Sequence, residues 1–213
     1  MERKELADLR RDFSSEELSE SAVSPSPFEQ FSLWMDEALA AKVLDANAMT
    51  VSTVGEDSRP SARVVLLKHF GDDGFVFFTN YESKKGTDLS LNPFAVMHFF
   101  WPQLDRQAAV YGKVERTSRD ESEKYFNSRP LESRLGAWAS NQSRIIASRA
   151  VLEERVKELR ARYGEDVPLP PIWGGFRLIP DRFEFWQGRQ NRLHDRILYS
   201  LAGDVWQISR LSP

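Results

Sequence analysis

Short apolar runs of strand length, separated by turn sequences, constrain the fold of this chain more than any other feature. Two of the turns are Gly-Glu-Asp-Ser at 55–58 and Gly-Asp-Asp-Gly at 71–74. Short turns join neighbouring strands antiparallel, and several such strands can close on themselves, so the pattern predicts an antiparallel barrel. The predicted strands lie at about 48–54, 61–70, 75–80, 94–101, 106–115, 173–180, 182–187, 192–199 and 204–210.

Helices are predicted around this sheet from serine N-cap signals at Ser26, Ser83 and Ser118, and from apolar periodicity at about 148–163. The fold class is therefore mainly β with peripheral helices. The segment 1–26, rich in Glu, Arg and Ser, is expected to be mobile, and 27–213 to form one domain.

The net charge of −3 gives the chain no overall basic field, so neither nucleic acid nor a membrane is an expected partner. There is no cysteine, which excludes disulfides, thiolate nucleophiles and cysteine-ligated metals. The three histidines form no ligand motif, so no metal is expected. Dinucleotide, P-loop, hydrolase and kinase motifs are also absent. Without a signal peptide or an apolar run of membrane length, a soluble, cytoplasmic protein that uses an organic cofactor is expected.

Near the C-terminus, two arginines and a histidine alternate along a predicted strand. Period-2 alternation would place Arg192, His194 and Arg196 on one face. Cationic groups so arranged repel one another unless they are solvated or share an anionic ligand. A solvated strand face is the alternative, and the nearby Trp186 favours a binding site.

Three other segments offer groups that suit an anion. Arg63 and Lys68 lie at the two ends of an apolar run and would face opposite sides of a strand, so they could bind two different ligand groups. The alternative is that both side chains extend to solvent. A helix is predicted to start at Lys84 and Lys85 directly after a strand, and the free N–H groups and the two lysines there could bind a phosphate. The alternative is an ordinary lysine-rich helix start. The third segment has a phenol, a guanidinium and a hydroxyl four residues apart, at Tyr125, Arg129 and Ser133, and these groups could hold a phosphate. The alternative interpretation is a solvated helix end.

Taken in order, these segments resemble the pyridoxamine 5'-phosphate oxidase family. The matching motifs are Arg63 to Lys68, Phe78-Thr79-Asn80, Ser83-Lys84-Lys85, Tyr125 to Pro130, Gly136-Ala137-Trp138, Gln142-Ser143, Trp173-Gly174-Gly175 and Phe185 to Arg196. The resemblance covers about residues 28–213. It implies an FMN-binding split β-barrel that forms a homodimer, with sites at the subunit interface and a dimerisation and substrate region at about 170–213.

The resemblance also implies site residues. FMN would be held by Arg63, Val64, Val65, Leu66, Leu67, Lys68, Phe78, Thr79, Lys84, Lys85, Gln107, Gln142, Ser143, Trp186 and Arg196. The substrate phosphate would be held by Lys68, Tyr125, Arg129 and Ser133, with further contacts from Arg10, Arg11, Asp12 and Phe13. Arg192 and His194 would lie over the substrate ring as catalytic residues.

The implied reaction oxidises pyridoxamine 5'-phosphate or pyridoxine 5'-phosphate to pyridoxal 5'-phosphate, the final step of vitamin B6 cofactor synthesis. A hydride passes to the flavin, dioxygen becomes hydrogen peroxide, and the amine also releases ammonia. A flavin reductase of the same fold should lack the Arg192 and His194 pair, whereas a non-catalytic pyridoxal-phosphate or flavin carrier is a further alternative. The chain departs from the family at Lys84, where arginine is common, at Phe13, where tyrosine is common, and in its added Arg189.

Overall fold

The computed structural model describes Phe13 and residues 17–213, so the expected contacts of Arg10, Arg11 and Asp12 lie outside the described residues. Its helices are α1 (Pro27–Ala40), α2 (Lys84–Leu91), α3 (Arg119–Asn127), α4 (Leu131–Ala139), α5 (Arg149–Tyr163) and the short 3-10 turn η2 (Gln190–Arg192). Its strands are β1 (Ala48–Val54), β2 (Pro60–Leu66), β3 (His69–Gly71), β4 (Gly74–Asn80), β5 (Phe94–Trp101), β6 (Arg106–Arg116), β7 (Trp173–Gln187), β8 (Asp195–Ala202) and β9 (Val205–Arg210). Among the helices in this part of the chain, none is long and apolar enough to span a membrane.

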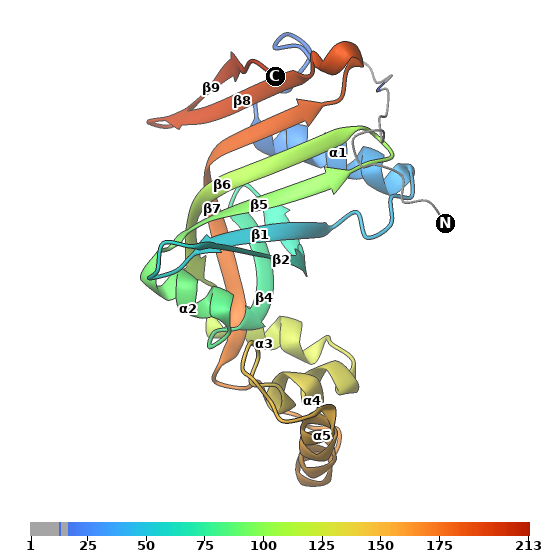
Figure 1. Cartoon of the computed structure of the whole chain (residues 1–213), viewed down its shortest axis with the longest axis vertical. Coiled ribbons are helices and arrows are strands. Elements are labelled where there is room, and N and C mark those ends of the chain that lie inside the picture. Colours follow the sequence, from blue (N-terminus) through green and yellow to red (C-terminus); the bar gives the residue numbers. More distant parts are fainter. Residues whose placement is uncertain (1–12, 14–16) are drawn as a thin grey trace, which may run out of the picture. The chain divides into compact units, whose positions relative to one another are not determined.

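The strands form one sheet in the order β2-β1-β5-β6-β7-β4-β3, to which β8 adds on β7 and β9 on β8 (Figure 1). The pairs β3–β4, β4–β7, β7–β8 and β8–β9 are antiparallel. The predicted mainly β, antiparallel fold with peripheral helices is confirmed. The three predicted serine caps are also present, since Ser26, Ser83 and Ser118 each accept a hydrogen bond from a backbone N–H three residues on.

The structure joins two predicted strands into the single strand β7, although Pro180 lies within it. Residues 173–178 pair with β4 and residues 182–187 pair with β8. Pro180 falls between the two pairings, so its missing N–H removes no bond to either strand.

The strand predicted at 192–199 begins three residues later than expected, at Asp195. Asn191 and Arg192 have left-handed backbone, with φ of 56° and 61°, which a strand cannot contain. Arg192 therefore lies in the turn before β8, and the prediction that it shares a strand face with Arg196 is wrong.

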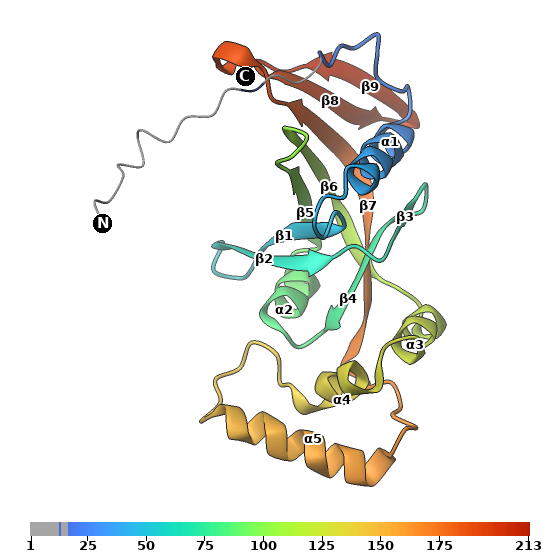
Figure 2. The same cartoon turned by 90° about the vertical axis from the view of Figure 1, so that its right-hand side faces the viewer.

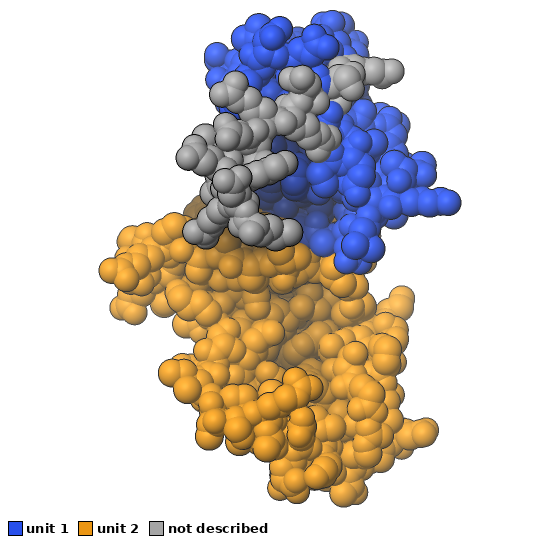
Figure 3. All heavy atoms as spheres, turned by 45° about the vertical axis from the view of Figure 1, so that its right-hand side comes forward, with its two compact units in different colours: residues 1–49, 98–110, 181–213 blue, residues 50–97, 111–180 orange. Residues whose placement is uncertain are grey.

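Two compact units make up the chain (Figure 3): residues 1–49, 98–110 and 181–213 form unit 1, and residues 50–97 and 111–180 form unit 2. Aromatic rings dominate the core of unit 1, where Phe31 meets Phe99 at 4.9 Å and Trp34 meets Phe185 at 5.1 Å between ring centroids. In unit 2, α4 lies beside α5 (Figure 2), where Arg155 donates to the carbonyl of Ala139 at 3.2 Å. Each unit thus has a packed core that can hold side chains in place.

Candidate active site

A cavity of about 630 Å³ in unit 2 gathers most of the predicted cofactor residues. Those that line it are Arg63, Val64, Val65, Phe78, Thr79, Lys84, Lys85, Gln142 and Ser143. Two predicted phosphate ligands of the substrate, Arg129 and Ser133, line it as well. The end of β4 and the start of α2 therefore face α4 and the loop after it across one space, as the sequence segments alone could not show.

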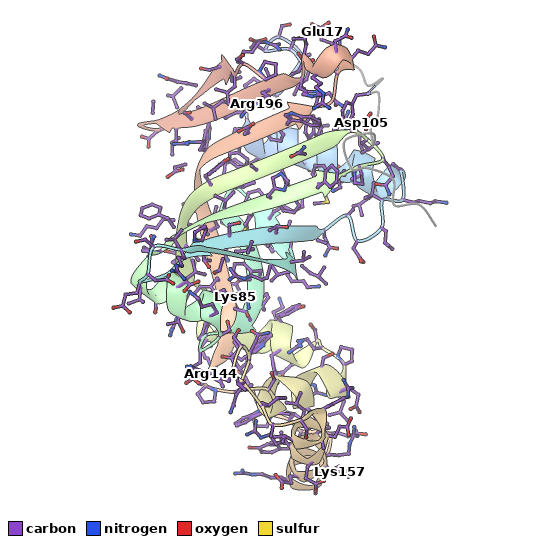
Figure 4. All side chains as sticks on the ribbon, in the orientation of Figure 1. Glu17, Lys85, Asp105, Arg144, Lys157 and Arg196 are labelled. Atoms are coloured by element: carbon purple, nitrogen blue, oxygen red, sulfur yellow. The ribbon has the colours of Figure 1, made fainter. Side chains whose placement is uncertain are left out.

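Lys85 is the most buried cation of this cavity, with 6% of its surface exposed, and Figure 4 labels it on α2. Its Nζ donates to Thr79 Oγ1 at 3.0 Å, to Ser83 Oγ at 3.3 Å and to Gln142 Oε1 at 3.1 Å. Burial, and then the nearby charge of Arg63, lower the pKa of Lys85 to about 8. Because its partners are neutral, the ammonium group lacks a counter-charge that an anionic ligand could supply.

Arg63 and Lys84 bring two more cations to the same cavity. The guanidinium of Arg63 donates to the carbonyl of Val51 at 3.1 Å, and burial lowers its pKa. Lys84 Nζ lies 2.7 Å from Oδ1 of the buried Asp88. Burial raises the pKa of Asp88, but hydrogen bonds, first from Lys84, outweigh it and lower the pKa overall, so this carboxylate stays charged.

Arg129 extends from the turn after α3 over a stack of aromatic rings. Its guanidinium lies 4.7 Å from the centroid of the Trp173 ring. Phe78 stacks on Tyr125 at 4.0 Å and on Trp173 at 5.7 Å between centroids, and Lys68 Nζ lies 6.0 Å from the Tyr125 centroid. Arg129 Nη1 is buried without a hydrogen-bond partner among the described residues. Because Arg129 also lines the cavity, its guanidinium is suited to an anionic group of a ligand.

Gly86 lets α2 begin close to the preceding chain, because a Cβ there would overlap the backbone carbonyl oxygen of Tyr81. We expect Gly86→Ala to lower the free energy of unfolding by about 1–3 kcal/mol, since backbone cannot rotate away. Chemical denaturation of the protein without ligand measures this. Gly136→Ala in α4 is the matched control: its Cβ meets nothing within 4 Å, and it should stabilise by about 0.5–1 kcal/mol. Equal effects of the two variants would contradict the explanation.

Another group of predicted site residues lies in unit 1. Trp186 and His194 are 4.6 Å apart between ring centroids, and Phe13 lies edge-on to both, at 5.7 Å and 5.3 Å. Arg196, labelled in Figure 4, donates through Nε to Glu184 Oε1 at 2.8 Å, while Arg192 is exposed. These rings and cations form a second cluster around the start of β8.

Gln107, on β6, also belongs to unit 1. Its Oε1 lies 2.9 Å from Nε2 of His98, on β5, so this predicted cofactor ligand has a histidine neighbour that no motif indicated. Of the remaining predicted cofactor residues, Leu66 is 41% exposed at the end of β2, and Leu67 is buried.

Several residues at the cavity were not predicted as ligands. Asn80 donates to the carbonyl of Ser140 at 3.4 Å and so ties the end of β4 to the loop after α4. Trp173 provides the ring under Arg129. Asp88 anchors Lys84 and accepts from Thr53 at 2.8 Å. The spacing of four between Lys84 and Asp88 was a signal for that pair, but nothing local indicated Thr53.

Comparison with known proteins shows which sequences this chain resembles. Residues 35–163 match the family described as Pyridoxamine 5'-phosphate oxidase, and residues 173–213 match the Pyridoxine 5'-phosphate oxidase C-terminal dimerisation region. A pyridoxine/pyridoxamine 5'-phosphate oxidase of Burkholderia vietnamiensis (strain G4 / LMG 22486) is 58% identical over 211 residues, covering 98% of this chain and 99% of the relative.

Solved structures are similar as well. PhzG from Burkholderia lata 383, in complex with tetrahydrophenazine-1-carboxylic acid, has a TM-score of 0.88 at 29% identity, covering 94% of this chain and 100% of that chain. A pyridoxamine 5'-phosphate oxidase-related, FMN binding protein from Nostoc punctiforme PCC 73102 has a TM-score of 0.70 at 18% identity, covering 90% and 100%. The second likeness concerns the fold alone.

Proposed function

Because this chain belongs to the pyridoxamine 5'-phosphate oxidase family, we propose that it oxidises pyridoxamine 5'-phosphate and pyridoxine 5'-phosphate to pyridoxal 5'-phosphate, with FMN as cofactor and dioxygen as electron acceptor. The observation that supports this most is the presence of two separate sets of anion-binding groups at one cavity. One set surrounds Lys85 and the other surrounds Arg129. A phosphorylated cofactor and a phosphorylated substrate together require two such sets.

The residues around Lys85 fit the phosphate of FMN. Arg63, Lys84 and Lys85 offer three cations, and the N–H groups at the start of α2 add a favourable dipole. Thr79 donates to Gln142 at 3.0 Å, and both would contact neighbouring polar atoms of the cofactor. When bound, FMN would supply the redox chemistry by accepting a hydride from the substrate and passing two electrons to dioxygen. The protein supplies position and charge.

Arg129 and Ser133 would hold the substrate phosphate, with Lys68 and Tyr125 beside them. The guanidinium of Arg129 lines the cavity against the Trp173 ring, so it would be suited to pairing with a phosphate there. Arg192 and His194 would face the substrate ring. We further propose that residues 27–213 act as one domain that assembles as a homodimer through the matched C-terminal region, with both subunits contributing to each site.

The purified protein with FMN tests this proposal in four parallel assays. Oxygen uptake and pyridoxal absorbance should develop with pyridoxamine 5'-phosphate. Flavin reduction by a nicotinamide donor without these products would support a reductase instead. Oxidation of tetrahydrophenazine-1-carboxylic acid, the molecule found in the PhzG complex, in preference to the phosphorylated substrates would indicate a different substrate class. Tight binding of FMN and pyridoxal 5'-phosphate without turnover would identify a carrier.

The pKa of Lys85 predicts a pH dependence of FMN binding. This pKa is lowered to about 8, so the unliganded protein loses the charge above pH 8 and binding the phosphate then requires proton uptake. Affinity should be nearly constant at about pH 7 to 7.5, where the FMN phosphate is a dianion, and about tenfold weaker at pH 9, as measured by flavin fluorescence titration. Riboflavin has no phosphate and is the control. A fall of equal size for riboflavin would show that Lys85 is not responsible.

Arg192→Met should impair substrate handling far more than FMN retention. The exposed Arg192 lies beside His194 in unit 1, whereas Lys85 and its neighbours belong to unit 2. We expect kcat/KM to fall by about 10- to 100-fold, since a charged hydrogen bond contributes about 1.5–3 kcal/mol. FMN titration and steady-state kinetics on the same preparation measure the two effects. Equal losses of affinity and turnover would place Arg192 at the cofactor.

A further inference from the structure

The backbone amide of Arg189 determines which nitrogen of His194 can hold a proton. The Arg189 N–H donates to Nδ1 of His194 at 3.1 Å. A ring nitrogen that accepts a hydrogen bond has its lone pair free and no proton of its own. The neutral imidazole of His194 is therefore the tautomer protonated at Nε2, on the opposite side of the ring.

The turn between these two residues is shaped for this contact. Leu193 N–H donates to the carbonyl of Gln190 at 3.1 Å, and both intervening residues have left-handed backbone. Non-glycine residues adopt this conformation at an energetic cost, so other contacts must hold it. One such contact is the bond from the Arg189 N–H to His194, and separately the Nε of Arg189 lies 3.4 Å from Oδ2 of Asp195.

The surroundings of His194 also favour the neutral ring. Its two aromatic neighbours, Trp186 and Phe13, present no charge. Burial and the charge of Arg192 lower the pKa of His194, and Asp195 opposes them.

The carboxylate of Asp195 is not available to His194 alone. It accepts the Leu18 N–H at 3.1 Å and lies 2.7 Å from Nη1 of Arg210, in addition to its contact with Arg189. A carboxylate so engaged stabilises an imidazolium less than a free one would. Protonation of His194 at Nδ1 would also break the bond from the Arg189 amide.

We propose that His194 acts as a neutral hydrogen-bond donor through Nε2–H toward an oxygen atom of the substrate, and that the amide of Arg189 is the group that positions it. His194 then does not take a proton from the substrate through Nε2, because that nitrogen already has one. The role toward substrate depends on the proposed function, whereas the tautomer is a property of the protein without substrate.

Nitrogen-15 NMR of histidine-labelled protein, without substrate, tests the tautomer directly. His69 and His98 are the other two histidines, and the signal missing from His194→Gln identifies His194. At pH 7.5 we expect Nδ1 to be unprotonated and Nε2 protonated, with titration only below the ordinary histidine range. A proton on Nδ1, or a charged ring at pH 7.5, would overturn the proposal, whatever the result of the oxidase assay.

Arg189→Ala is the matched control, because it keeps the backbone N–H and removes the guanidinium. The tautomer of His194 should be unchanged in this variant. A switch of the proton to Nδ1 would assign the effect to the guanidinium and its contact with Asp195, and so contradict the positioning role of the amide.

Kinetics then separate a donor from a base. His194→Gln places an amide N–H near the position of Nε2, so kcat/KM should stay within about tenfold of the parent value. Any loss of activity at low pH that protonation of His194 causes should be absent from this variant. His194→Leu offers no donor and should lose about 10- to 150-fold. An equally large loss in both variants would indicate a base and overturn the proposal.

Discussion

Lys85→Met is expected to weaken FMN binding by about 2–5 kcal/mol, roughly 30-fold or more, because it removes the one ammonium group that is buried in the cavity wall and has neutral partners. Methionine keeps the length and apolar stem of the side chain. The unliganded protein should be no less stable, since the substitution removes a desolvated charge. Fluorescence titration with FMN and denaturation without ligand measure both effects.

Two comparisons sharpen this result. Riboflavin should bind the variant and the parent protein equally, because the lost interaction is with the phosphate. Lys157→Met, on the exposed α5, is the control for a change of net charge and should leave FMN affinity unchanged. If riboflavin affinity falls as far as FMN affinity, Lys85 supports the shape of the cavity and does not bind the phosphate.

The second large effect is expected for Arg129→Met, which should lower kcat/KM for pyridoxamine 5'-phosphate by about 2–5 kcal/mol, roughly 30-fold or more. The Nη1 atom of Arg129 is buried without a partner among the described residues, and burial lowers the pKa of the guanidinium. A substrate phosphate in the cavity that Arg129 lines would pair with the charge of this guanidinium. Stability should not fall, because the parent protein already leaves this nitrogen unsatisfied. Steady-state kinetics and denaturation provide the measurements.

Pyridoxamine without its phosphate is the substrate control, and the variant should oxidise it as slowly as the parent protein does. Arg134→Met is the matched variant, since Arg134 also has a buried nitrogen without a partner in the described part of the chain but is not among the residues that line the cavity. If Arg134→Met reduces turnover of the phosphorylated substrate as much as Arg129→Met, the loss reflects packing of α3 and α4 and not phosphate binding.

Much of the fold could be predicted because its signals are local. The bounds of β1 and β5 agree with the predicted strands at 48–54 and 94–101, and Ser26, Ser83 and Ser118 cap helices as expected. The strand face predicted from alternation was wrong at Arg192, because a left-handed turn precedes the strand and no glycine or proline in the turn indicates it. A strand was also divided at Pro180, because periodicity does not show which partner each half will have.

The candidate ligands around Lys85 and Arg129 were recognisable in the sequence by residue type and order, since charge, hydrogen-bonding groups and helix-start signals are properties of short segments. The protonation and pairing of these side chains could not be recognised there. Lys85 meets Gln142 across 57 residues and Asp88 meets Thr53 across 35. The lowered pKa of Lys85 depends on burial, and the retained charge of Asp88 depends on hydrogen bonds, and folding creates both. The tautomer of His194 likewise depends on where a turn directs one backbone N–H. The sequence determines which ionisable and hydrogen-bonding side chains are present. Only the tertiary structure determines their protonation and their partners, because both depend on the distances and desolvation that packing imposes.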